Sequence, residues 1–227
     1  MKYIIMCGGQ YKPFVSEFRP LVKINGETLV NRTIRLLREF GITDIAVSVP
    51  LDCDLLDNIG VEVLKIDNSF GFKDDVGAFT GTYADAFYIT DEPATYLNGD
   101  TFYSKAAIKE IIDAETDDVI FFGTGTPFPN GYNKGMREHL GFKVVNQDKF
   151  HKGLDRFRYL QYHDWLHDVY LRFPIMWQVA QVVAGDQTDR VVETPSNFVP
   201  IYSFADDIDY DYEIKELEDV VKEYCIV

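Results

Sequence analysis

The sequence predicts an α/β protein built as a single-domain three-layer sandwich, with a mainly parallel mixed sheet and helices on both faces. Short apolar runs alternate with segments of helical periodicity, a pattern typical of parallel sheets whose crossovers are helices. The chain has 227 residues, which suits one large domain. Its hydrophobic content of 46% is sufficient for a core shared by three layers. We therefore expect residues 1–227 to form one domain.

The first expected element is a strand over residues 3–6, buried on both faces because the run is continuously apolar. The glycine pair Gly8 and Gly9 then forces a tight turn at its carboxyl end. A cationic loop follows, and residues 29–40 have the spacing of a helix that ends near Gly41. This order suits a chain that holds a polyphosphate at the carboxyl end of its first strand.

Later runs continue the alternation. Further strands are expected at residues 45–49, 61–64, 94–97, 119–122 and 141–145. Helical patterns cover residues 106–114 and, more weakly, 82–89. Residues 123–135 are rich in Gly and Pro and predict a long binding loop. Residues 159–183 are aromatic and mostly helical with a break at Pro174, and 211–224 form an acidic amphipathic helix.

Composition narrows the function. The formal net charge of −15 argues against a protein whose main ligand is nucleic acid, since phosphate binding there needs clustered Lys and Arg. No apolar run approaches the roughly 20 residues of a membrane helix, and a secretory cleavage pattern is missing. The three cysteines lack metal-ligand spacing and are most simply free thiols in a reducing compartment. We expect a cytoplasmic protein without a nucleic-acid or membrane partner, whereas the sequence does not indicate its oligomeric state.

Charge is distributed unevenly along the chain. The first 23 residues contain Lys2, Lys12, Arg19 and Lys23 against the single acid Glu17. A locally basic segment in an acidic protein fits the capture of one small polyanion. The alternative, ordinary solvated side chains, is equally compatible with charge alone.

Two acidic positions follow apolar runs. Asp100 comes directly after a predicted strand and a glycine, where ligand chemistry usually lies in such sheets, and its carboxylate can hold Mg²⁺. It can equally cap the helix that starts near Ser104. Near the C-terminus, alternation places Asp207 and Asp209 on one face, which would complete a Mg²⁺ site with Asp100. The competing interpretation is an acidic turn that complements the dipole of the last helix.

Together these residues resemble the sugar-phosphate nucleotidyltransferases and their relatives, the phosphocholine cytidylyltransferases of bacterial surface-polysaccharide pathways. The resemblance spans nearly the whole chain and implies the nucleotide-diphospho-sugar transferase fold. The segments that carry it are Gly8-Gly9 after residues 4–7, residues 19–27 beginning Arg19-Pro20-Leu21-Val22-Lys23, residues 41–45, Thr80-Gly81-Thr82, Asn98-Gly99-Asp100 and Asp207-Ile208-Asp209.

The resemblance implies an Mg²⁺-dependent transfer in which an acceptor phosphate attacks the α-phosphorus of an NTP and pyrophosphate leaves. The partners would be an NTP and a phosphorylated sugar or alcohol. Asp100 and Asp209 would hold the metal, and Arg19 and Lys23 would neutralise phosphate, so that Arg19, Lys23 and Asp100 are the expected catalytic residues. The nucleotide would contact Gly8, Gly9, Lys12, Thr80, Gly81, Thr82 and Asn98.

The chain departs from the family pattern at two positions. The usual Gly-Gly-x-Gly loop lacks its third glycine here, and Lys12 stands where an arginine is expected. The lysine of the family's Pro-Lys-Pro falls at Arg19, which keeps the charge but changes its reach. These changes leave open a non-catalytic nucleotide-binding relative.

Two other activities remain as alternatives. A glycosyltransferase on the same type of sheet would use an Asp-x-Asp such as Asp207-Ile208-Asp209 to hold the metal of an NDP-sugar. His163 and His167 have the i, i+4 spacing of a helical zinc site, with Asp164 in place of the zincin glutamate. The more economical interpretation makes these histidines one polar face of an aromatic helix.

Overall fold

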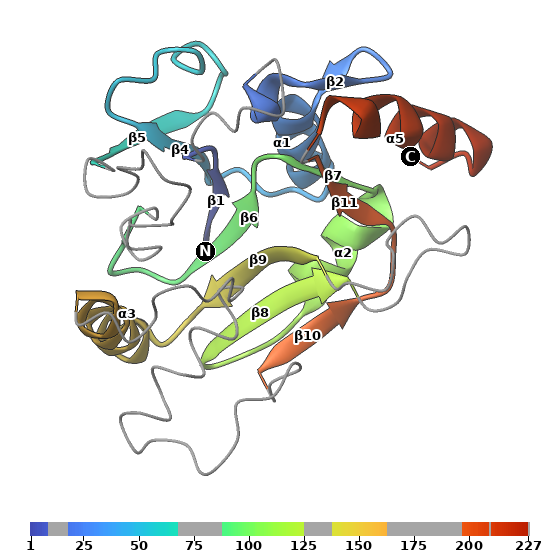
Figure 1. Ribbon diagram of the computed structural model, residues 1–227. Coiled ribbons are helices and arrows are strands. Elements are labelled where there is room, and N and C mark those ends of the chain that lie inside the picture. Colours follow the sequence, from blue (N-terminus) through green and yellow to red (C-terminus); the bar gives the residue numbers. More distant parts are fainter. Residues whose placement is uncertain (9–17, 68–87, 125–137, 163–196, 209, 227) are drawn as a thin grey trace.

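The computed structural model describes residues 1–8, 18–67, 88–124, 138–162, 197–208 and 210–226 (Figure 1). Their centre is a seven-stranded sheet with strand order β10-β8-β9-β6-β1-β4-β5. The strands are β1 (Lys2–Met6), β4 (Ile45–Pro50), β5 (Glu62–Ile66), β6 (Ala94–Asn98), β8 (Val119–Thr124), β9 (His139–Val144) and β10 (Phe198–Ile201).

The sheet is mixed, as the sequence predicts. Strand β1 pairs in parallel with β4 and β6, β4 pairs in parallel with β5, and β10 pairs in parallel with β8. Strand β9 runs antiparallel between β6 and β8. A central parallel strand is covered on both faces, which explains the continuous apolar run Tyr3, Ile4 and Ile5, each at most 4% exposed.

Helices cover the two faces of the sheet. Ile5 of β1 packs in one cluster with Ile34 of α1 (Leu29–Glu39) and Ile108 of α2 (Lys105–Asp113). On the opposite face, Ile4 belongs to a cluster with Phe150 of α3 (Gln147–Tyr162). The two clusters use alternate residues of β1, because successive side chains of a strand point to opposite faces. The structure thus confirms the three-layer arrangement.

Local signals fix the ends of the helices. Thr28 caps α1 by accepting a hydrogen bond from the Asn31 amide at 3.3 Å, and Ser104 caps α2 by accepting from the Ala107 amide at 3.1 Å. Gly41 follows α1 with a φ of 78°, the left-handed conformation that commonly ends a helix. Among the described helices, none is long and apolar enough to cross a membrane.

A smaller assembly continues from the carboxyl end of the sheet (Figure 1). It contains the 3₁₀ helix η1 (Arg19–Leu21), the hairpin of β2 (Lys23–Ile24) and β3 (Glu27–Thr28), the antiparallel pair of β7 (Thr101–Tyr103) and β11 (Ala205–Asp207), and α5 (Asp211–Glu223). A separate apolar cluster joins them, with Ile24 of β2, Phe102 of β7 and Leu217 of α5 as members.

The predicted elements agree with the structure where both can be compared, with three differences. Helix α3 begins at Gln147, earlier than the predicted start at 159. The short strands β2, β3, β7 and β11 were not predicted from the sequence, and Asp206 and Asp207 lie in β11 rather than in a turn. Most of the expected helix at 82–89, most of the expected loop at 123–135 and residues 163–183 of the expected helical segment lie outside the described residues.

Candidate functional site

The topology marks one edge of the sheet as a ligand site. The chain leaves β1 toward β4 on one side and later returns to β6 on the other, so the strand order reverses at β1. In open α/β sheets, ligands bind outside the carboxyl ends of the strands at such a reversal. Gly8 and Asp100 follow the carboxyl ends of β1 and β6 respectively. Two residues far apart in the chain therefore come to the same edge.

Gly99 brings these two strand ends close together. Its amide donates to the Met6 carbonyl at 2.9 Å. A Cβ on residue 99 would lie 2.6 Å from the Cys7 Sγ and 2.7 Å from the Met6 oxygen, and real Cβ contacts are not that short. Only glycine therefore allows this approach, and Asp100 follows immediately.

Arg19 and Asp100 form an ion pair at this edge. The Arg19 Nη1 lies 2.7 Å from the Asp100 Oδ2, with 12% and 22% of the respective side chains exposed. The same nitrogen donates to the Ile208 carbonyl at 3.1 Å. The Ile208 amide in turn donates to the Asp100 carbonyl at 3.2 Å. The structure thus joins three predicted segments: the Arg19 loop, the end of β6 and the acidic segment near the C-terminus.

A second aspartate, Asp207, lies on the strand that pairs with the residues after Asp100. In the β7–β11 ladder Asp207 is the register partner of Thr101, the residue after Asp100. Burial raises the pKa of the Tyr103 hydroxyl strongly, and the negative charges of Asp100 and Asp207 add to that rise. Asp207 was expected to share a face with Asp209, and the structure places it opposite Thr101 in the β7–β11 ladder. Asp209 itself lies outside the described residues.

Asn98, the last residue of β6, is held by hydrogen bonds to neighbouring segments. Its Nδ2 donates to the His139 carbonyl on β9 at 2.6 Å, and its amide donates to the Tyr103 Oη at 3.1 Å. The Tyr103 hydroxyl donates to the Leu140 carbonyl at 2.5 Å. Tyr103 thus crosses under the site and ties β7 to β6 and β9. The Asn98 side chain, for which we expect a role in nucleotide binding, thus donates to a backbone carbonyl of β9.

Lys23 is an exposed residue of β2 whose register partner is Thr28. Among the described residues it forms no ion pair, so the structure brings Arg19 and not Lys23 to Asp100. Gly8 is buried at the end of β1. The remaining predicted residues lie outside the described part of the chain: Gly9, Lys12, Thr80, Gly81, Thr82, Asp209, and the alternative zinc ligands His163 and His167.

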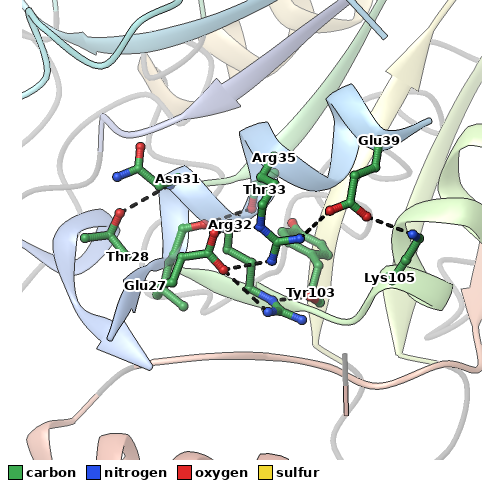
Figure 2. Close-up of polar contacts among 10 residues, drawn as sticks. Glu27, Thr28, Asn31, Arg32, Thr33, Arg35, Glu39, Tyr103 and Lys105 are labelled. Atoms are coloured by element: carbon green, nitrogen blue, oxygen red, sulfur yellow. Dashed lines mark hydrogen bonds and ion pairs between the residues drawn. The ribbon is translucent and has the colours of Figure 1, made fainter. Parts of the chain in front are cut away.

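A network of polar contacts ties α1 to the β2–β3 hairpin and to β7 (Figure 2). Arg35 grips both carboxylate oxygens of Glu27 at 2.8 Å, and this hydrogen bonding lowers the pKa of Glu27. Arg32 lies with its guanidinium carbon 4.1 Å from the centre of the Phe102 ring, and its Nε donates to the Tyr103 carbonyl at 2.9 Å. No local pattern in the sequence predicts this network, because its members come from separate segments of the chain.

Glu110 of α2 also has a structural role that the sequence does not predict. Its carboxylate accepts from the amides of Tyr202 and Ser203 at 2.8 and 3.1 Å, and from the Ser203 hydroxyl. It thereby fixes the turn between β10 and β11, which leads to Asp207. No local sequence signal marks this role, because Glu110 looks like an ordinary helix-surface acid.

No family model matches the sequence, and no curated protein matches it either. Solved structures do match. The inositol-1-phosphate CTP transferase from T. maritima has a TM-score of 0.58 at 14% identity, with 98% of this chain and 96% of that chain covered. The 2-C-methyl-D-erythritol 4-phosphate cytidylyltransferase from Thermus thermophilus gives 0.54 at 11% identity, over 97% and 98%.

A third match is the CTP:phosphocholine cytidylyltransferase from Streptococcus pneumoniae, with a TM-score of 0.52 at 15% identity over 97% of this chain and 98% of that chain. The matches are nearly full-length in both directions. The chain therefore has the fold of sugar-phosphate and cytidylyl transferases, and the resemblance seen in the sequence is confirmed at the level of the fold.

Proposed function

We propose that the protein is an Mg²⁺-dependent nucleotidyltransferase that joins an NTP to a phosphorylated sugar or alcohol. The products are an NDP-activated compound and pyrophosphate. The observation that carries the proposal is the ion pair of Arg19 and Asp100 at the carboxyl edge where the strand order reverses, in a chain with this fold. A role in surface-polysaccharide synthesis is a finer proposal that rests on the resemblance to phosphocholine cytidylyltransferases.

The reaction needs alignment and charge neutralisation more than covalent chemistry. An oxygen of the acceptor phosphate attacks the α-phosphorus, the bond from that phosphorus to the oxygen bridging to the β-phosphorus breaks, and pyrophosphate departs with the electron pair. Arg19 would neutralise phosphate charge, since its planar fork suits phosphate oxygens. Lys23 is the second expected cation, and Gly8 and Gly9 would let backbone amides approach the nucleotide closely.

The oxygen donors at the site are of the kind that Mg²⁺ prefers. Asp100 supplies a carboxylate, the Ile208 carbonyl accepts from the same guanidinium, and Asp209 is the next residue in the chain. The described residues alone contain no group of three or more acidic, histidine or cysteine ligands. A metal there would supply charge neutralisation at the α-phosphate, and Asp100 and Asp209 would hold it.

A pyrophosphate-release assay tests the proposal. The five common triphosphates are each combined with inositol 1-phosphate, phosphocholine, glucose 1-phosphate or 2-C-methylerythritol 4-phosphate, with and without Mg²⁺. We expect pyrophosphate and an equal amount of NDP-linked product from one triphosphate, only with metal. Asp100→Asn should abolish pyrophosphate release. Lys109→Gln, which removes a charge from the exposed surface of α2, should leave it unchanged.

The same panel separates the alternatives. Turnover of an NDP-sugar without pyrophosphate would replace the proposal by a glycosyltransferase. Saturable NTP binding without product for any acceptor, and with Asp100→Asn changing only affinity, would indicate a non-catalytic relative.

A further inference from the structure

We propose that Arg19 is held by Asp100 in the ligand-free protein and leaves that carboxylate when a divalent cation binds, which makes its guanidinium available to substrate phosphate. The inference rests on the proposed function and concerns how that site is loaded. Metal and phosphate would then bind cooperatively through one arginine side chain.

The Arg19 guanidinium contacts two oxygen atoms. One guanidinium nitrogen, Nη1, contacts both the Asp100 carboxylate at 2.7 Å and the Ile208 carbonyl at 3.1 Å. The Asp100 carboxylate is the group that would hold a metal at this edge. Both side chains of the pair are partly exposed, so an ion from solvent can reach them.

Charge makes the two occupants competitors. The two oxygens of one carboxylate share a carbon atom, so a divalent ion bound to either oxygen would lie within a few ångströms of the guanidinium. Like charges at that separation repel strongly where water is partly excluded. Asp100 therefore binds the metal at the expense of its contact with Arg19.

The backbone around Arg19 favours a side-chain movement over a loop rearrangement. Arg19 opens η1, where Pro20 is buried and the Leu21 and Val22 amides donate to the carbonyls of Phe18 and Arg19 at 2.8 and 3.0 Å. The backbone is thus fixed on the C-terminal side of Arg19. The long side chain can exchange partners about this fixed point.

The exchange of partners by Arg19 couples metal binding to phosphate binding. In the ligand-free protein the metal must displace a cation, which weakens metal binding. A phosphate that takes the released guanidinium removes that penalty, and by reciprocity the metal strengthens phosphate binding by the same factor.

The first experiment measures Mn²⁺ binding by electron paramagnetic resonance, with Mn²⁺ as the probe and no nucleotide present. Arg19→Gln should bind Mn²⁺ at least about tenfold more tightly than the unmodified protein, because the competing cation is gone. Arg38→Gln removes the same charge from the exposed end of α1 and should change affinity less than about twofold. Asp100→Asn should weaken binding, which places the ion at this carboxylate.

Equal or weaker Mn²⁺ binding by Arg19→Gln would overturn the inference, as would unchanged binding by Asp100→Asn. Because the assay contains no substrate, its result is separate from turnover. A working transferase whose Arg19→Gln variant gains no Mn²⁺ affinity would disprove the exchange alone. Tightened Mn²⁺ binding in a protein that turns over no triphosphate would support the exchange and disprove the proposed function.

A second measurement avoids substitution at Arg19. Side-chain ¹⁵N resonances of arginine are recorded for the unmodified protein during titration with Mg²⁺ alone, with Arg19 assigned from the Arg19→Gln spectrum. We expect the Arg19 signals to shift and their Nη rotation to quicken at saturation, while those of Arg35 stay constant. Unchanged Arg19 signals at saturating Mg²⁺ would overturn the inference.

Discussion

Arg19 and Arg35 both pair with a carboxylate, yet the two pairs are built differently. Arg35 grips Glu27 with two nitrogens and Glu39 with the third, and Glu39 continues to Lys105 at 2.8 Å (Figure 2). The ion pair of Arg19 with Asp100 uses a nitrogen that also donates to a backbone carbonyl. In the α1 network, one arginine binds two carboxylates. At the candidate site, one guanidinium nitrogen contacts a carboxylate oxygen to which a metal could also bind.

The largest effect should come from the site and be measured in turnover. Under the proposed function, Asp100→Asn should lower kcat/KM by about 10³-fold, equivalent to about 4 kcal/mol, because it removes the carboxylate proposed to hold the metal at the reacting phosphate. The free energy of unfolding should change far less, since the amide keeps the shape of the side chain. Steady-state kinetics and urea unfolding of the same preparation check this. A parallel collapse of stability would mean that Asp100 is structural, and the comparison would fail.

Gly99→Ala should lower both the free energy of unfolding and the turnover. The new methyl would meet Cys7 Sγ and the Met6 carbonyl, so we expect a loss of about 1–3 kcal/mol in the free energy of unfolding, as for other overpacked positions. Turnover should also fall, because relief of the clash displaces Asp100. Adding Cys7→Ala removes only one of the two clashes, so a double-mutant cycle should show partial rescue. Unchanged stability of the single variant would contradict the close approach.

Glu27→Gln tests the α1 network. It removes the carboxylate shared by Arg35 and the largely buried Arg32, and we expect a loss of about 1–2 kcal/mol in the free energy of unfolding. The value of kcat should stay within about twofold when corrected for folded protein. Glu223→Gln, on the exposed end of α5, serves as a control with the same charge change. A large loss of kcat in Glu27→Gln at normal stability would place this network in the chemistry.

Lys143 provides the smallest and most specific test, because within the described residues its buried ammonium has carbonyl partners and no ion pair. It donates to Ile111 and Ala114 at 3.3 and 2.5 Å at the end of α2, and burial lowers its pKa below 10.5. The folded protein therefore releases this proton at a lower pH than the unfolded chain does. Between those two pKa values the unfolded chain binds more protons, so stability rises with pH toward 10.5.

Comparison with Lys143→Met isolates this contribution. The unfolding free energy of the unmodified protein minus that of the variant should increase as pH rises toward 10.5. At lower pH, where the lysine is charged in both states, the difference should be flat. Urea unfolding of both proteins across this range measures it, and a difference that falls with pH would show that the carbonyl contacts outweigh burial.

Much of the fold follows from local patterns. Continuous apolar runs mark the parallel strands because these strands are buried on both faces, and Thr28, Gly41 and Ser104 mark helix ends. The edge that holds Gly8 and Asp100 also follows, since topology assembles the carboxyl ends of the central strands. These predictions depend on neighbours in sequence or on general rules of sheet topology.

The remainder depends on partners far apart in the chain. Strands β7 and β11 have three residues each and pair across a long stretch of sequence, so periodicity gives no signal for them. Glu110 acts on Ser203, and Arg32 acts on Tyr103, through contacts that only the folded chain creates. The position of Asp207 opposite Thr101 could not be predicted either, because it is set by the β11 register.

The contact between Arg19 and Ile208 spans 189 positions and has a consequence for biosynthesis. A nascent chain that has emerged only through β9 already contains Arg19 and Asp100, but not the segment that follows β10. The arginine then lacks the Ile208 acceptor, and the β11 partner of β7 is absent. The candidate site is therefore among the last parts of the protein to be assembled during synthesis.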